Sequence, residues 1–231
     1  MLYMDPLYWA FLLPGLFLAT IATMYVKSTF ARYSKVRARS GMTGAQAAQA
    51  MLERSGVTGV RIERAHGFLS DHYDPSDKVL RLSPDVYDRP SLSAIGVACH
   101  EAGHALQDAQ EYYWLGLRTA LVPLASIGSN FSYMVFFLGL FLGSMAMVKT
   151  GIVLFSAAVL FSIVTLPVEW NASARAKEAM VNCGIVGSSE AEAAGNVLNA
   201  AFLTYVAGAV SAILTLLYFL MRAGLLGGRR D

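Results

Sequence analysis

The sequence predicts an α-helical membrane protein with about four transmembrane helices and a small α+β segment. Of its 231 residues, 55% are hydrophobic and only 15% are charged, which is too apolar for an ordinary soluble domain. Four runs lack Asp, Glu, Lys, Arg and His, and each approaches the roughly 20 residues that cross a bilayer. These runs are 7–26, 120–148, 150–168 and 193–221.

The distribution of basic residues predicts the orientation of these spans. The first run has no basic region before it and no small-residue cleavage site before Lys27, so we interpret it as a retained anchor. Basic residues then cluster at Lys27, Arg32, Lys35, Arg37 and Arg39. By the positive-inside rule the segment that follows is cytoplasmic, and a turn at 148–150 is external. The tail would then also be external, although Arg222, Arg229 and Arg230 oppose that placement by the same rule.

The polar region after the first run shows signals for a small mixed domain. Thr43 and Gln46 have the spacing of a capping box, and Gly56 follows as a helix stop. Apolar and charged residues alternate at 60–63 and 79–82, as in half-buried strands, with a turn at 74–77 between them. Ser91 or Ser93 could cap the helix that comes next.

These signals divide the chain into five parts. The parts are an N-terminal transmembrane anchor (1–27), a cytoplasmic α+β segment (28–118), a transmembrane hairpin (119–168), a helix with a cytoplasmic connection (169–192), and a C-terminal transmembrane helix with its tail (193–231). Cys99 and Cys183 are the only cysteines, so no disulfide framework is expected. A net charge of +2 is too small to suggest nucleic-acid binding.

The sequence His-Glu-Ala-Gly-His at 100–104 predicts a catalytic metal site. On a helix His100 and His104 are i and i+4, so both imidazoles project from one face with the separation that Zn²⁺ requires. Glu101 lies beside them as a candidate general base. Catalytic zinc takes a third protein ligand, for which Glu169 at the cytoplasmic end of the third span is a candidate. The alternative is that Glu169 only faces headgroup water.

The chain resembles the YugP-type neutral zinc metallopeptidases, a family of bacterial membrane proteins, and more distantly HtpX and the CAAX prenyl endopeptidases. The resemblance rests on the first span, the Gly-Phe-Leu-Ser-Asp-His-Tyr-Asp-Pro segment at 67–75, the motif helix, the span pair after it, and Pro-Val-Glu-Trp-Asn-Ala-Ser at 167–173. It implies a gluzincin-like domain in which His100, His104 and Glu169 hold Zn²⁺ and Glu101 activates water. The HtpX-like pattern has aspartate four residues after the ligand glutamate, whereas this chain has Ser173, a weaker and neutral partner for a ligating histidine.

Several other residues are candidates for the site. His72 could be a third ligand, a donor to the transition state or an exposed loop residue, and we favour the last two. Tyr73, Tyr112 and Tyr113 could donate a phenol to an oxyanion, or belong to the interfacial aromatic belt. Arg175 could contact a headgroup or a carboxylate, or have a catalytic role as a donor to the transition state.

The expected function is that of a multi-pass zinc metalloendopeptidase of the bacterial inner membrane, with its active site facing the cytoplasm. Its partners would be the lipid bilayer and a protein or peptide substrate, which could add as a strand to the small sheet. A regulatory membrane partner or a homo-oligomer is left open. One alternative is a zinc-stabilised scaffold without turnover. Structural zinc sites prefer four protein ligands, often cysteine, but Cys99, the cysteine near the motif, points about 100° away from His100 around the helix. The other is a site-2-type intramembrane protease, against which Gln107, Asp108, Gln110 and Glu111 argue as polar neighbours of the motif.

Overall fold

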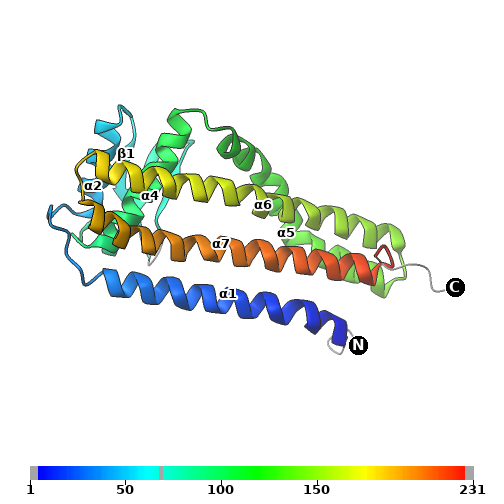
Figure 1. The fold of residues 1–231 in the computed structure, drawn as a ribbon. Coiled ribbons are helices and arrows are strands. Elements are labelled where there is room, and N and C mark those ends of the chain that lie inside the picture. The colour runs from blue at the N-terminus through cyan, green and yellow to red at the C-terminus, as the bar shows by residue number, and fades with distance from the viewer. Residues whose placement is uncertain (1–4, 68–69, 227–231) are drawn as a thin grey trace. The chain divides into compact units, whose positions relative to one another are not determined.

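The computed structural model describes residues 5–67 and 70–226. The chain forms two compact units, of which the first comprises 1–22, 117–166 and 204–231 and the second comprises 23–116 and 167–203. The helices are α1 (Pro6–Tyr33), α2 (Gly44–Arg54), α3 (Pro84–Tyr87), α4 (Leu92–Ala109), α5 (Tyr113–Phe141), α6 (Met145–Asn182) and α7 (Ser188–Arg222) (Figure 1). The strands are β1 (Arg61–Arg64), β2 (His72–Asp74) and β3 (Val79–Leu82).

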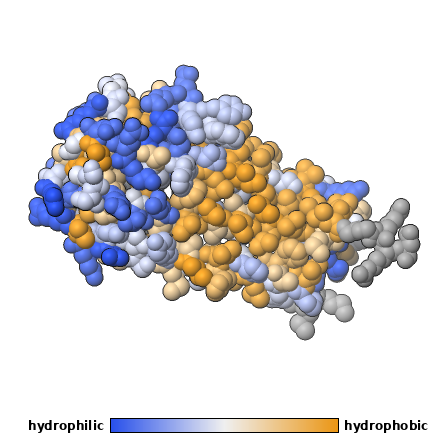
Figure 2. Space-filling view, in the orientation of Figure 1, coloured by the Kyte–Doolittle hydropathy of each residue, from blue (hydrophilic) through white to orange (hydrophobic). Residues whose placement is uncertain are grey.

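The first unit is built from long apolar helices. Within the described residues, four helices are long and apolar enough to cross a membrane, namely α1, α5, α6 and α7. Large side chains such as Phe17, Ile127 and Val153 are exposed on them, and Figure 2 shows apolar residues gathered over the helical surface. Exposed apolar side chains on such helices are suited to lipid rather than to water. The expectation of four spans is confirmed in this respect.

Glycines allow α5 and α6 to approach closely inside the first unit. A Cβ atom on Gly128 would lie 2.3 Å from the carbonyl oxygen of Leu154, and one on Gly151 would lie 2.7 Å from Cβ of Phe136. Small residues at such crossings let helix backbones come into contact without a side chain between them. Phe136 in turn stacks on Phe219 of α7, with ring centroids 3.9 Å apart.

The turn between the second and third spans lies earlier than the sequence indicated. We expected it at 148–150, around the charged Lys149, but α5 ends at Phe141 and α6 begins at Met145. Gly143 makes the turn with a φ of +66°, a conformation that favours glycine. Lys149 is exposed in the second turn of α6, where a lysine can extend toward the membrane surface.

The second unit combines helices with a small sheet. Its sheet has the order β1-β3-β2, with β1 parallel and β2 antiparallel to β3. The predicted strands correspond to β1 and β3, whereas β2 was not predicted because its three residues lack an alternating apolar pattern. Thr43 and Gln46 form the expected capping box of α2. Ser91 caps α4, since its side chain accepts a hydrogen bond from the backbone nitrogen of Ala94.

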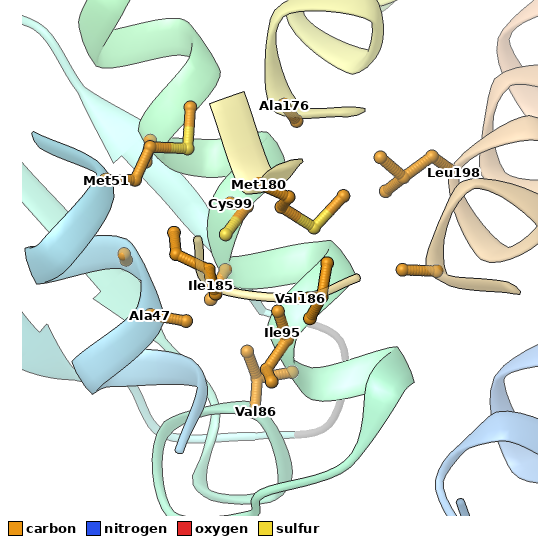
Figure 3. Packing of buried hydrophobic residues seen from close by; sticks show 14 of the residues in the cluster. Ala47, Met51, Val86, Ile95, Cys99, Ala176, Met180, Ile185, Val186 and Leu198 are labelled. Atoms are coloured by element: carbon orange, nitrogen blue, oxygen red, sulfur yellow. The ribbon is translucent and has the colours of Figure 1, made fainter. Parts of the chain in front are cut away.

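The core of the second unit surrounds α4. Figure 3 shows Ile95 and Cys99 of α4 packed among side chains from α2, α6 and α7, including Met51, Met180 and Leu198. Cys99 is fully buried, and burial raises the pKa of its thiol. The motif helix is therefore held on several sides by apolar contacts, which fix the direction of its remaining face.

Candidate metal centre

A close contact between α4 and α6 brings the predicted ligands together. A Cβ atom on Gly103 would lie 2.6 Å from the carbonyl oxygen of Ala172, so glycine is needed for the two helices to approach this closely. Gly103 directly precedes His104, and Ala172 lies three residues after Glu169 on the same helix. The crossing therefore places Glu169 opposite the two histidines of the motif.

The three predicted ligands converge at one point. The Nε2 atoms of His100 and His104 lie 3.2 and 3.5 Å from Oε2 of Glu169. The candidate ligand atoms of all three residues lie within 4.8 Å of one another. The three side chains are 13%, 8% and 2% exposed, respectively. A tetrahedral Zn²⁺ with ligands at about 2.0–2.1 Å has ligand-to-ligand distances of roughly 3.3–3.4 Å, so this donor set fits the ion.

The surroundings of His104 also favour a cation at Nε2. Its Nδ1 lies 2.9 Å from Oε1 of Gln107, and its Nε2 faces the carboxylate of Glu169. Burial lowers the pKa of His104, but the hydrogen bond and charge of Glu169, with Glu101 and Gln107, outweigh burial and raise the pKa above its usual value. An imidazole between two acceptors needs a proton or a metal ion on the nitrogen that faces the carboxylate.

His100 has a hydroxyl as its second partner. The Oγ atom of Ser173 lies 3.1 Å from Nδ1 of His100, so the position four residues after Glu169 does contact a candidate ligand. Ser173 is buried. The contact predicted at this position is therefore present, and it is made by a neutral group.

Glu101 follows His100 in the motif and interacts electrostatically with His104. It is buried, and its negative charge contributes to raising the pKa values of His104 and of Asp71. Asp71 precedes β2 and accepts hydrogen bonds from the backbone nitrogen and the hydroxyl of Ser83, at 2.7 and 3.0 Å. Burial is the main reason why the pKa of Asp71 is raised. The carboxyl groups of Glu101 and Asp71 therefore lie close enough to interact electrostatically.

Comparison with known proteins agrees with this geometry. A family model described as "Putative neutral zinc metallopeptidase" matches residues 8–224. The chain belongs to this metallopeptidase family. It is also 47% identical over 200 residues to a protein of Bacillus subtilis (strain 168) named "Putative membrane protease YugP", covering 87% of this chain and 89% of the relative. No solved structure is significantly similar to the chain. The resemblance to the YugP-type neutral zinc metallopeptidases is confirmed.

Two of the remaining candidate tyrosines, Tyr73 and Tyr112, have partners of their own. The hydroxyl of Tyr73 donates to Oδ2 of Asp108 at 2.7 Å, and burial is the main reason why the pKa of Tyr73 is raised. Tyr112 lies under the guanidinium of Arg175, 5.7 Å from the ring centroid, and Tyr113 is exposed.

His72 lies on an edge strand rather than in a loop. It is exposed on β2, and its Nδ1 lies 2.8 Å from the carbonyl oxygen of Ser70. The segment that carries it in the family resemblance begins at Gly67, and residues 68 and 69 of that segment lie outside the described part of the chain. Among the described residues, His72 is not part of the group of candidate metal ligands.

Two site residues of the metallopeptidase were missed by the sequence reasoning. Gln107 was noted only as a polar neighbour of the motif, but it is fully buried and contacts His104. Asn171 accepts hydrogen bonds from Gln107 at 3.0 Å and from Nε of Arg175 at 2.6 Å. The available signal was the spacing, since Gln107 lies one helical turn after His104 and Asn171 lies two residues after Glu169.

Proposed function

We propose that this family member is a zinc metalloendopeptidase that hydrolyses peptide bonds of membrane-associated or misfolded proteins at the cytoplasmic face of the bacterial inner membrane. The observation that supports this proposal most directly is the convergence of His100, His104 and Glu169 at distances suited to tetrahedral zinc, with Glu101 nearby. The three ligands leave one coordination position for water, as in catalytic rather than structural zinc sites.

In the proposed reaction Glu101 is the general base. Bound zinc supplies two effects, since it lowers the pKa of water to about 7 and polarises the scissile carbonyl. Glu101 takes the proton from water as the water oxygen bonds to the carbonyl carbon. The carboxyl group of Glu101 then gives this proton to the amide nitrogen as the peptide bond breaks, which returns the carboxylate to its starting form.

The small sheet offers a place for the substrate backbone. Strand β2 is at the edge of the sheet in the order β1-β3-β2, and it also packs against α4. An extended peptide can add to such an edge through backbone hydrogen bonds, which explains why side-chain specificity need not be strong. The alternative is that the strands only cover the motif helix. The basic cluster that begins at Lys27, near the end of α1, supports a cytoplasmic location for this edge.

Two substitutions test the assignment of the base and of the third ligand. Glu101→Gln should retain one zinc per chain but lose roughly 10²–10⁴-fold in cleavage, because the amide cannot accept the proton. Glu169→Ala should lose zinc, because only two imidazoles remain. Zinc content is measured by atomic absorption, and cleavage by proteolysis of unfolded casein in detergent.

The outcomes separate this proposal from its alternatives. Cleavage by Glu101→Gln at the wild-type rate would remove Glu101 as the base. Zinc in the wild-type protein without cleavage of unfolded or membrane-tethered substrates would favour a scaffold. A site-2-type protease would require its motif helix within the bilayer, whereas α4 is not among the four helices that are apolar enough to cross it.

A further inference from the structure

We propose that Gln107 is a positioning residue that fixes which nitrogen of His104 faces the metal and joins α4 to α6 beside Glu169. This inference rests on the proposed zinc site but concerns residues beyond its ligands. It starts from the burial of Gln107, which is 0% exposed although its amide is polar. A buried amide is costly unless its donors and its acceptor are paired, and here both ends of the amide have partners.

The orientation of the Gln107 amide follows from its partners on α6. One end of the amide lies 2.8 Å from the carbonyl oxygen of Val168, which can only accept a hydrogen bond. The same end lies 3.0 Å from Oδ1 of Asn171. This end must therefore be the NH₂ group, and a flipped amide would place one oxygen against two others.

Arg175 fixes the orientation of Asn171 in the same way. Its Nε lies 2.6 Å from Oδ1 of Asn171, and a guanidinium can only donate. The Asn171 atom shared by Arg175 and Gln107 is therefore oxygen. The hydrogen bonds that link Arg175, Asn171 and Gln107 therefore each have one possible direction. The guanidinium of Arg175 can only donate, and the carbonyl of Val168 can only accept.

The consequence at His104 is a defined tautomer. With its NH₂ group turned toward α6, Gln107 presents Oε1 to Nδ1 of His104 at 2.9 Å. Nδ1 must then carry a proton, which leaves the lone pair of Nε2 directed toward Glu169 and the metal position. A hydrogen bond to the outer nitrogen of a ligating histidine commonly sets both its tautomer and its ring orientation.

The amide of Gln107 also links the imidazole of His104 to the segment of α6 that carries Glu169. Val168 and Asn171 lie immediately before and two residues after Glu169 on α6. One side chain of α4 therefore holds His104 on its own helix and the backbone next to Glu169 on the other. Loss of Gln107 should affect the spacing of two ligands at once, and it would leave the carbonyl of Val168 without this donor.

The test compares Gln107→Leu with Gln49→Leu as a matched control. Gln49 is an exposed residue of α2 whose amide donates to Glu53 at 2.6 Å. The Gln107 variant should bind zinc about 10–100-fold more weakly, as is typical when the outer partner of a ligating histidine is removed. The control should bind zinc as the wild-type protein does. Affinity is measured by competition with a zinc chelator in detergent.

A spectroscopic measurement on the wild-type protein tests the inference without any variant. In zinc-loaded protein labelled with ¹⁵N-histidine, His104 should carry its proton on Nδ1, and this proton should exchange slowly with water. In Gln107→Leu the same proton should exchange faster. A general loss of packing would not by itself move the proton from one nitrogen to the other.

The results that overturn this inference differ from those that overturn the proposed function. A zinc-loaded wild-type protein with the His104 proton on Nε2, or a Gln107→Leu variant with unchanged zinc affinity, would reject the role of Gln107 while leaving the peptidase intact. A wild-type protein that binds no zinc would instead reject the metal site itself.

Discussion

At the scale of single residues, the site combines groups that the sequence reveals with groups that it hides. His100, Glu101 and His104 could be predicted from the sequence, because a five-residue helical motif determines their relative positions. Glu169 lies 69 positions after His100, and its place depended on the membrane topology and on the family resemblance. The spacing of Gln107, one helical turn after His104, was an available signal, but spacing alone does not distinguish a buried glutamine from an exposed one. Its role depends on contacts with α6 that no local pattern encodes.

Asp71 gives a prediction for pH dependence. Its pKa is raised in the folded protein, mainly by burial, so the folded state binds this proton more tightly than the unfolded state does. The free energy of unfolding should therefore fall as the pH rises from about 4 through the raised pKa. Asp71→Asn keeps an oxygen for Ser83 but has no charge to bury, so the variant should gain stability relative to wild type over this range.

Chemical unfolding of the zinc-free protein in detergent, between pH 3.5 and 7, measures this difference. Asp85→Asn provides a control on the exposed side of α3, where Asp85 pairs with Arg89 at 2.8 Å. If the free energy of unfolding changes with pH in the same way for wild type and Asp71→Asn, burial of Asp71 is not the cause of the pH dependence.

At the scale of elements, the predicted helices and strands were recognisable wherever a local signal existed. The capping box of α2 and the alternation in β1 and β3 are such signals. Strand β2 has none, because its pairing with β3 is settled by the sheet and by contact with α4. The turn after α5 was misplaced because Lys149 was taken as its marker, whereas Gly143 makes it. Charge alone therefore gave the wrong boundary.

Gly103 supplies a prediction for the crossing of α4 and α6. Alanine at this position would place Cβ 2.6 Å from the backbone oxygen of Ala172, which cannot move without moving α6. We expect Gly103→Ala to lower zinc affinity at least about 10-fold and the free energy of unfolding by about 1–3 kcal/mol, through overpacking. This loss should appear although alanine is the better helix former by about 1 kcal/mol.

Gly96→Ala on the same helix is the matched control. Its added Cβ would lie 3.2 Å from the carbonyl oxygen of Ala194, a contact that a small shift relieves, and it is two turns from His104. Zinc titration and chemical unfolding of both variants measure the difference. Equal effects on zinc binding would mean that the crossing at Gly103 does not position the ligands.

At the scale of the whole molecule, composition and charge-free runs predicted the membrane class and the number of candidate spans. The basic tail opposes the predicted orientation by the positive-inside rule, and in the structure Arg222 has an acidic partner. Its Nε lies 3.3 Å from Oδ2 of Asp5, so an acidic residue at the start of α1 balances its charge. This contact within the first unit also agrees with an even number of spans, which places both residues on one side. Arg229 and Arg230 lie outside the described residues.

The orientation can be tested with reporter fusions. Alkaline phosphatase fused after Asp231 should be active, since the tail is predicted to be external, whereas the same enzyme inserted between Gly56 and Gly59 should be inactive. Green fluorescent protein at the two positions should give the opposite pattern. Measurement of both reporters in intact cells distinguishes orientation from expression level. Inverted signals would place the metal centre on the external face.

The two hydrogen-bond acceptors behind the histidines, Ser173 and Gln107, are both uncharged. A carboxylate in either place would make its imidazole a stronger electron donor. In the proposed site, Zn²⁺ bound by Glu169 and two neutral imidazoles would keep a formal charge of +1. It would therefore be a stronger Lewis acid than in a site whose histidines are hydrogen-bonded to carboxylates. Weaker electron donation by the imidazoles also lowers the affinity of the site for Zn²⁺. We therefore expect the fraction of protein that holds zinc to depend on the concentration of free zinc in the cell.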